Sequence, residues 1–265
     1  MVCSVETASK HYSQFGQDEW VAKLFRGKRN GYFIEMGAAD GVFLSNTLFL
    51  EKKFGWTGLL VEPTRNFQRL VKNRPGCVSD NSCVASERKI VNLFEAYLLT
   101  DSSEDTIMSI VRDDLDIKDY KTINDGHDLV CERAYQVNAV PLEEILLKHS
   151  VPKVVDYFSL DVEGQEYEVL KNFPFQEYTF MCLGVECPTV ELHELLEKKG
   201  YIYILRKGCD DMYVHRSLKS YLFLRIFIPV LFLRFLNLFK RAALKVKRIF
   251  DATVKKRNVR CGLSE

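Results

Sequence analysis

The chain has 265 residues, of which 47% are hydrophobic and 28% are charged, so it is long enough for one substantial packed domain or a domain with an appendage. The formal net charge of +1 hides an asymmetry, because residues 216–265 hold 13 Lys and Arg against 2 Asp and Glu, a charge of +11, whereas the remainder carries −10. This acidic body argues against a nucleic acid substrate, because a polyanion requires a positive surface near its site.

The first part of the chain alternates between helical and extended patterns. The predicted elements are a helix over residues 17–25, a buried strand over 32–36, a helix over 45–54, a strand over 58–62, a helix over 63–71, and strands over 82–85 and 90–97. Ser45 or Asn46 is the expected N-cap of the second helix, and Pro63 begins the third. This part of the chain therefore supplies strands and helices in the alternation typical of α/β proteins.

Residues 99–130 differ from the segments on either side. They are rich in Asp and Glu and show little sustained hydrophobic periodicity. We expect an irregular insertion near the ligand cleft. Two interpretations stay open, a lid over the cleft and a solvated acidic loop without a role.

Regular patterns resume after residue 132. The predicted elements are strands over 135–139, 154–162 and 179–186, helices over 141–149, 166–172 and 190–199, and an antiparallel hairpin formed by 201–205 and 212–215. Strands that alternate with helices predict an α/β fold, with a mostly parallel sheet covered by helices on both faces. Ligands in such sheets bind beyond the carboxyl ends of the strands.

The first predicted strand and the turn after it carry the most information about a ligand. Gly37 and Gly41 allow the backbone to turn sharply and to approach a bound molecule closely, because neither has a Cβ. Glu35 and Asp40 place two carboxylates at this turn, and Glu62 ends the next strand. The acids therefore lie at neighbouring strand ends, where a ligand is expected.

A phosphate ligand is disfavoured at this turn. The carboxylates of Glu35 and Asp40 would repel a pyrophosphate in a partly desolvated cleft. The two glycines, Gly37 and Gly41, also lack the three-glycine spacing of a dinucleotide site. Two carboxylates suit a cationic amine, and Glu62 suits the hydroxyls of a ribose. S-adenosylmethionine carries both groups.

Five motifs occur in an order that resembles one known family. They are SQFGQDE, GYFIEMGAADG, SNTL, GWTGLLVEP and LDVEG, which begin at residues 13, 31, 45, 55 and 160. In these motifs the chain resembles the FkbM family of S-adenosylmethionine-dependent methyltransferases, and within it the Star-like animal branch. The resemblance covers residues 12–215 and implies a class I methyltransferase (Rossmann-like) domain, with an N-terminal arm over 1–11 and a tail over 216–265.

The resemblance also implies site residues and an activity. Glu35, Gly37 and Gly41 match the first-strand motif of the family, Glu62 matches its ribose-binding acid, and Asp40 matches a position near the methionine end of the cofactor. Characterised bacterial members methylate a hydroxyl of a small molecule or sugar, whereas Star-like proteins are associated with vesicle traffic. The implied acceptor is therefore a hydroxyl on a small molecule, a lipid or a glycan.

Two positions modify this expectation. Ala85 ends a predicted strand at a place where an adenine ring is expected to rest, so we include it among the cofactor-binding residues. Val42 stands directly after the Asp-Gly pair, where the Star-like pattern has an acid. This departure removes one charge from the rim of the turn.

Asp161 and Glu163 are the candidate catalytic residues. They follow the predicted strand over 154–162, where related folds place residues that face the transferred methyl group. Asp161 is expected to orient the acceptor hydroxyl or to accept its proton. The alternatives are a divalent ion held by both carboxylates, and a structural reading in which Asp161 caps the following helix and Glu163 faces solvent.

The cysteines and histidines give no metal-site signal. The eight cysteines form no C-x-x-C pair, and no zinc-type spacing with histidine occurs. We therefore expect the cysteines to be small buried apolar residues, and we predict no metal centre.

The tail suggests a membrane surface. Residues 221–239 contain fourteen Leu, Ile, Val or Phe residues, but Arg225, Pro229 and Arg234 interrupt them, and a strongly basic segment follows. Apolar anchors with clustered cations suit an anionic lipid surface. An interfacial helix and a tail anchor are both open, as is a helix that packs on the body or on a second subunit.

Two functions from different classes follow. The first is an active O-methyltransferase recruited to a membrane through residues 216–265. The second is a catalytically silent methyltransferase-like protein that acts in membrane or vesicle trafficking. Both are expected at the cytoplasmic face of a membrane, with the endomembrane system as a candidate location.

Overall fold

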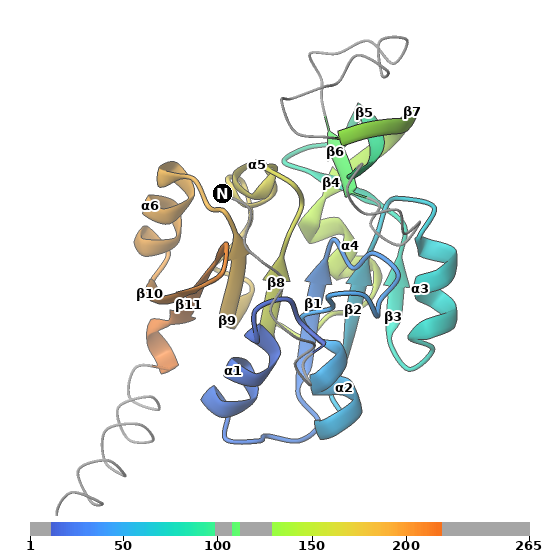
Figure 1. The fold of residues 1–265 in the computed structure, drawn as a ribbon. Helices are drawn as coiled ribbons and strands as arrows, with labels where there is room; N and C mark the ends of the chain where they lie inside the picture. The colour runs from blue at the N-terminus through green and yellow to red at the C-terminus, as the bar shows by residue number, and fades with distance from the viewer. Residues whose placement is uncertain (1–11, 99–107, 112–128, 219–265) are drawn as a thin grey trace, which may run out of the picture. The chain divides into compact units, whose positions relative to one another are not determined.

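The computed structural model describes residues 12–98, 108–111 and 129–218 (Figure 1). Contacts divide the chain into two units, Met1–Arg216 and Ser217–Glu265, and the first unit holds both sheets and all six α-helices described below. Among the described residues, no helix is both long and apolar enough to cross a membrane. The predicted arm over 1–11 and almost all of the predicted tail lie outside the described residues.

A seven-stranded sheet forms the centre of the first unit. Its strands, in order across the sheet, are β10 (Tyr201–Lys207), β11 (Asp210–His215), β9 (Thr179–Glu186), β8 (Val154–Leu160), β1 (Tyr32–Met36), β2 (Thr57–Val61) and β3 (Val78–Asp80). All neighbours pair in parallel except β11, which is antiparallel to β9 and to β10. The predicted parallel sheet and its closing hairpin are therefore confirmed.

Helices cover both faces of this sheet (Figure 1). They are α1 (Gln17–Leu24), α2 (Leu48–Phe54), α3 (Phe67–Asn73), α4 (Leu142–Lys148), α5 (Glu166–Leu170) and α6 (Val190–Lys198). Adjacent residues of a strand point to opposite faces. On one face, Arg74 at the end of α3 lies over the Phe33 ring. On the other face, Ile34 belongs to a cluster that includes buried side chains of α4, α5 and α6.

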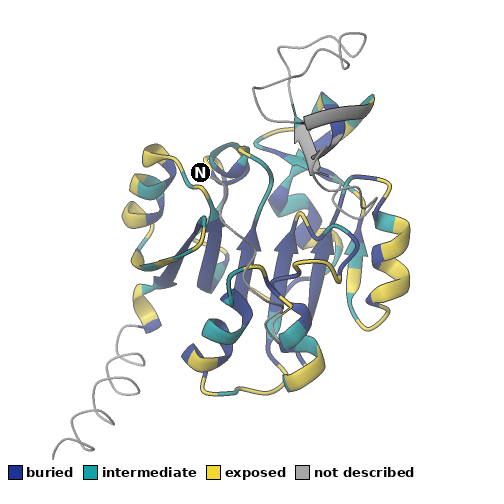
Figure 2. Ribbon diagram, in the orientation of Figure 1, coloured by how far each residue is buried: buried dark blue, intermediate teal, exposed yellow. Residues whose placement is uncertain are grey.

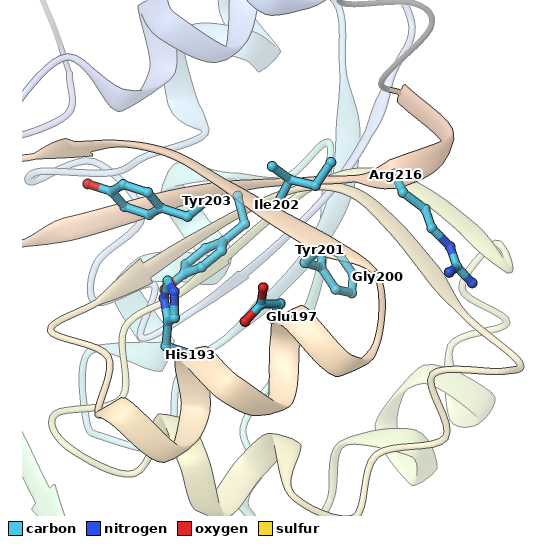
Figure 3. Close-up of a pocket in the computed structure, with 8 residues that line it drawn as sticks. His193, Glu197, Gly200, Tyr201, Ile202, Tyr203 and Arg216 are labelled. Atoms are coloured by element: carbon cyan, nitrogen blue, oxygen red, sulfur yellow. The ribbon is translucent and has the colours of Figure 1, made fainter.

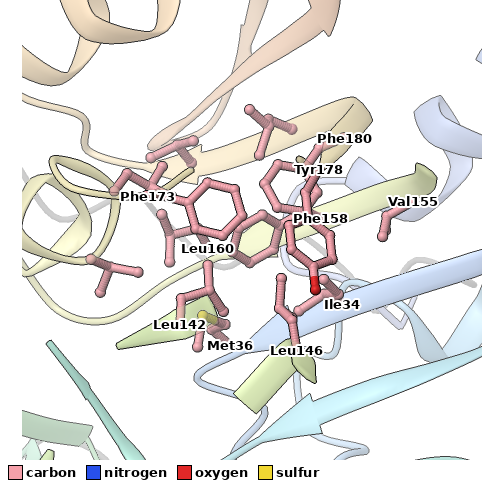
Figure 4. Packing of buried hydrophobic residues seen from close by; sticks show 14 of the residues in the cluster. Ile34, Met36, Leu142, Leu146, Val155, Phe158, Leu160, Phe173, Tyr178 and Phe180 are labelled. Carbon is pink, nitrogen blue, oxygen red and sulfur yellow. The ribbon is translucent and has the colours of Figure 1, made fainter. Parts of the chain in front are cut away.

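The larger core lies between the sheet and α4, α5 and α6 (Figure 4). The rings of Phe158 and Phe180 lie 4.8 Å apart, and the ring of Phe173 stacks on Phe180 at 5.3 Å. Leu146 of α4 is fully buried in the same cluster. Each such side chain contributes roughly 1.5–3 kcal/mol on burial. Figure 2 shows that the central strands of the large sheet, β1, β2, β8 and β9, are mostly buried.

A second, four-stranded sheet was not predicted. Its order is β4 (Cys83–Ala85), β7 (Leu129–Pro141), β5 (Lys89–Leu98) and β6 (Met108–Val111). The predicted strand over 82–85 therefore pairs with β7 and not with the large sheet, whose edge is the unpredicted strand β3. The acidic insertion over 99–130 includes β6 and the start of β7, so this part of it is not irregular; residues 99–107 and 112–128 lie outside the described residues.

Two helices begin later than predicted, and in both the residues before the helix bind a carboxylate. The third helix begins at Phe67 and not at Pro63, because the N–H and hydroxyl of Thr64 bind the Glu62 carboxylate. The second begins at Leu48 with Thr47, and not Ser45 or Asn46, at the N-cap position, and the Asn46 N–H before it donates to Glu35. In both places the chain before the helix binds a buried strand acid.

Candidate functional site

The turns after β1 and β8 approach each other at Gly37. Its φ is +76°, and a Cβ there would lie 1.9 Å from the carbonyl oxygen of Asp161. The Asp161 N–H donates to the Met36 carbonyl at 3.3 Å, and the N–H groups of Gly37 and Ala38 both donate to the Val61 carbonyl at 3.1 Å. Only glycine allows this close approach. The ends of β8, β1 and β2 therefore meet here, as the sequence predicts.

Glu35 lies behind this turn. Its carboxylate is 4% exposed and accepts hydrogen bonds from Ser45 Oγ, the Asn46 N–H and Thr47 Oγ1 at 2.5–3.0 Å. Burial raises the pKa of Glu35, and the Arg74 guanidinium, 3.8 Å away, opposes that rise. The carboxylate thus holds the segment before α2.

Asp40 and Gly41 shape the remainder of the turn. Asp40 Oδ1 accepts hydrogen bonds from the N–H groups of Val42 and Phe43, and its Oδ2 lies 3.5 Å from Arg69. Gly41 has a φ of +78°, and a Cβ there would lie 2.6 Å from Leu70 Cδ1. The structure therefore uses both residues to bend the chain against α3.

Arg74 organises the same segment and was not predicted. Its side chain is fully buried. It donates to the Gly41 carbonyl, Ser45 Oγ and Thr47 Oγ1 at 3.0–3.1 Å, and it forms an ion pair with Glu51. An arginine at the end of a polar helix gives no sequence signal of burial, because such residues are usually exposed.

Glu62 joins the turns after β2 and β1. Its buried carboxylate accepts from the Ala39 N–H at 2.8 Å and from the N–H and hydroxyl of Thr64 at 2.9 and 2.5 Å. Burial raises the pKa of Glu62, and these hydrogen bonds reduce the rise. Both Thr64 bonds reach Oε1, so Oε2, which accepts from Ala39, keeps acceptor capacity for a further donor.

A small cavity lies at the carboxyl ends of β1, β2 and β8, under the second sheet. It encloses about 40 Å³ and is lined by Met36, Gly37, Val61, Pro63, Ser82, Cys83, Val84, Leu93, Val111, Asp161, Val162 and Gln165. Two predicted site residues, Gly37 and Asp161, line it. Glu62 does not, but its neighbours in the sequence, Val61 and Pro63, do. Ala85 does not line it, although the three residues before Ala85 do.

Asp161 and Glu163 lie together, as predicted, and a third acid joins them. Oxygen atoms of Asp161, Glu163 and Glu186 lie within 4.8 Å of one another. Burial and the neighbouring Glu186 raise the pKa of Asp161 well above its ordinary value, and the same two causes raise the pKa of Glu163 to about 7. Glu186 was not predicted, although its place at the end of a buried strand is the signal that identified Glu62.

The structural reading of Asp161 as a helix cap is wrong. The N-cap of α5 is Gln165. The N–H groups of Val162 and Gly164 donate to the Glu166 carboxylate at 3.0 and 3.1 Å. The loop is therefore held by Glu166, and the carboxylate of Asp161 is left beside those of Glu163 and Glu186.

A second cavity, of about 460 Å³, lies between α6 and the β10–β11 hairpin (Figure 3). His193, Tyr203 and Tyr213 line it, and their rings lie 5.7–5.9 Å apart. None of the predicted site residues lines this cavity. This second cavity lies beside the end of β11. The acids Asp161, Glu163 and Glu186 lie near the other end of that strand, because Glu186 pairs with Asp210, the first residue of β11.

Comparisons with known proteins agree with the sequence motifs. The family model described as the methyltransferase FkbM domain matches residues 35–203. No curated protein sequence matches the chain.

Solved structures show low similarity. The METTL16 methyltransferase domain is 12% identical with a TM-score of 0.39 over 75% of this chain, and this chain spans only 65% of that domain. TrmK of M. capricolum in complex with S-adenosyl-homocysteine is 10% identical, with a TM-score of 0.37 over 77% of this chain and 68% of that one. A precorrin-6y C5,15-methyltransferase from Geobacter metallireducens is 8% identical, with a TM-score of 0.37 over 78% and 91%.

Proposed function

The chain belongs to the FkbM methyltransferase family, whose cofactor is S-adenosylmethionine, and from that membership we propose that it methylates a hydroxyl group of a small molecule, a lipid or a glycan. The observation that carries the proposal is the match of the family domain over residues 35–203, which includes the turn after β1, the acid after β2 and the acids after β8. The acceptor class comes from the motif resemblance.

The residues around the small cavity fit the cofactor. Glu62 would hold the ribose, because its buried carboxylate has a free acceptor position. Pro63 and Val84 offer apolar surface to an adenine ring, and the methionine end would lie against Gly37 and Asp161, which also line the cavity. Glu35, Asp40 and Gly41 would act indirectly, because their contacts hold the turn in place.

The cavity must widen for the cofactor to bind. It encloses about 40 Å³, whereas pockets for ligands of this size measure about 300–1,000 Å³. Leu93 and Val111 of the second sheet cover it, together with Val162 of the loop after β8. We therefore expect β5 and β6 to shift away from the large sheet when the cofactor binds.

The proposed chemistry uses the acids after β8. When bound, S-adenosylmethionine supplies an electrophilic methyl group on a positively charged sulfur. Asp161 would orient the acceptor hydroxyl in line with that methyl group, and Asp161 or Glu163 would take up the hydroxyl proton as the new carbon–oxygen bond forms. Positioning is expected to supply most of the rate.

A membrane role is the second part of the proposal. The apolar and basic composition of residues 216–265 supports association with an anionic membrane surface, at the cytoplasmic face. The competing function is a protein that binds the cofactor without turnover and acts in vesicle traffic, which the resemblance to the Star-like branch favours.

Turnover separates the two functions. The purified chain is incubated with S-adenosylmethionine that carries an isotopically labelled methyl group, together with a lipid and glycan extract. An active enzyme labels an extract component, and Asp161→Asn labels it at least about a hundredfold more slowly, while Glu177→Gln, which changes an exposed surface acid, matches the wild type. Cofactor binding without any labelled product would support the trafficking function.

A further inference from the structure

Two cysteines and a carboxylate meet where β9 ends and β11 begins. Asp210 pairs with Glu186 across these antiparallel strands, so the residues next to them, Cys209 and Cys187, lie opposite each other. The Cys187 N–H donates to the Cys209 carbonyl at 3.0 Å. The two sulfur atoms and an oxygen of Glu186 all lie within 4.8 Å of one another. The expectation that the cysteines are simply buried apolar residues therefore fails here, because Cys187 is exposed and Cys209 is half-buried.

The distances suit a tetrahedral metal ion. Zinc binds sulfur at about 2.3 Å and carboxylate oxygen at about 2.0 Å, so a sulfur and an oxygen on the same ion lie about 3.5 Å apart. Cys209 Sγ lies 3.6 Å from Glu186 Oε1, and it also lies 3.6 Å from Asp210 Oδ1. The distance from Cys209 Sγ to Glu186 Oε1 therefore matches two ligands of one ion, and the Cys187 sulfur lies within 4.8 Å of the Cys209 sulfur and of a Glu186 oxygen.

The local charge also favours a cation. Glu186 lies beside Asp161 and Glu163, and among the described residues no Lys or Arg side chain forms an ion pair with any of these three acids. Arg206, on the same hairpin as Cys209, is occupied by Asp211, to which it donates two hydrogen bonds at 2.7 and 3.1 Å. A divalent ion would supply the missing positive charge.

We propose that Glu186, Cys187 and Cys209 bind a zinc ion whose fourth ligand is water. Zinc is favoured over magnesium and calcium because two of the three donors are sulfur atoms, whereas the latter ions prefer oxygen. Three protein ligands with one open position are typical of zinc sites at which chemistry takes place. A disulfide between the cysteines is the competing arrangement, but both are free thiols in this structure, and the Cys209 thiol donates to Glu186 Oε1 at 3.6 Å.

The position of the site suggests what the ion does. Glu186 belongs both to the zinc ligands and to the acid group with Asp161 and Glu163, and Asp161 lines the small cavity. The ion would therefore fix the tip of the β10–β11 hairpin beside the acids proposed to receive the acceptor. Zinc binding is nonetheless independent of methyl transfer, so the site can exist even if the proposed function fails.

Metal titration of the full chain tests the site. The protein is stripped with a chelator under reducing conditions and titrated with zinc chloride or magnesium chloride, and both bound metal per chain and the thermal unfolding midpoint are measured. Cobalt is then substituted, because thiolate ligands give it a charge-transfer absorption in the near ultraviolet. We expect one zinc per chain and a raised midpoint, with cobalt–thiolate absorption.

Three variants make the result specific. Cys187→Ser and Glu186→Gln should each weaken zinc binding at least about tenfold, since even the loss of an outer-shell partner has an effect of this size. Cys77→Ser is the matched control, because the Cys77 thiol also lies beside a carboxylate, at 3.3 Å from Glu51, but it has no second thiol there. Unchanged zinc affinity in Cys187→Ser, stabilisation by magnesium alone, or a Cys187–Cys209 disulfide in the protein as isolated would overturn the proposal.

Discussion

Replacement of Gly37 by alanine has the most sharply defined consequence in this structure. A Cβ there would lie 1.9 Å from the Asp161 carbonyl oxygen, whereas ordinary contact begins at 3.4 Å, so the turns after β1 and β8 would have to separate by about 1.5 Å. The φ of +76° adds about 1–2 kcal/mol of backbone strain for a residue with a Cβ. We expect Gly37→Ala to lower the free energy of unfolding by roughly 3 kcal/mol or more.

Gly164→Ala separates the clash from the strain. Gly164 has a similar φ of +88°, but no atom lies within 4 Å of its ideal Cβ position. Only the backbone strain applies there, so we expect a loss of about 1 kcal/mol. The assay is equilibrium unfolding in urea for both variants and the wild type. Equal losses would refute the argument that the close approach of the two strand ends requires a glycine.

Three further predictions concern other parts of the chain. Arg74→Ala should lower the free energy of unfolding in urea by about 3–5 kcal/mol because it removes the cation beside the buried carboxylate of Glu35 and breaks the ion pair with half-buried Glu51, whereas Arg88→Ala, which changes an exposed pair, should have little effect. Burial opposes the ionisation of Asp80, but hydrogen bonds from Lys148, Ser82 and His149 outweigh it and hold the pKa below its usual range. The stability that Asp80 adds is therefore present above about pH 4 and is lost as the pH falls below that value. When the free energy of unfolding is measured against pH, Asp80→Asn should lose less stability below about pH 4 than the wild type does. An equal loss in both proteins would contradict this. Deletion of residues 219–265 should abolish sedimentation with anionic liposomes, and undiminished sedimentation would contradict the membrane proposal.

The large sheet could be predicted because most of its strands have a recognisable local pattern of apolar residues. The strands over 32–36 and 179–186 appear within their predicted bounds. The second sheet could not be predicted in the same way, because its main pairing joins β5 to β7 across an acidic segment of about thirty residues. β3 was missed because Val-Ser-Asp is too short to show a period.

The acids of the candidate site could be predicted from the sequence, but the contacts around them could not. Acids at strand ends are visible in a sequence once the strands are placed, and Glu62 and Asp161 were found in this way. The contacts that occupy those acids are not visible, because they depend on residues brought together by folding, such as Arg74 behind Glu35. The pair of Cys187 and Cys209 was missed for the same reason, since their neighbourhood follows from the register of β9 and β11.

Calorimetric titration of the purified chain with S-adenosylmethionine tests whether Glu62 holds the cofactor. We expect binding at one site, and we expect Glu62→Ala to weaken the affinity by about tenfold or more, since hydrogen bonds to a charged group contribute about 1.5–3 kcal/mol. The comparison is made at a temperature where both proteins are folded, with Glu177→Ala, which removes an exposed acid, as the control. Equal affinity in Glu62→Ala and the wild type would show that Glu62 does not hold the cofactor, and no binding by the folded wild type would show that the chain does not use it.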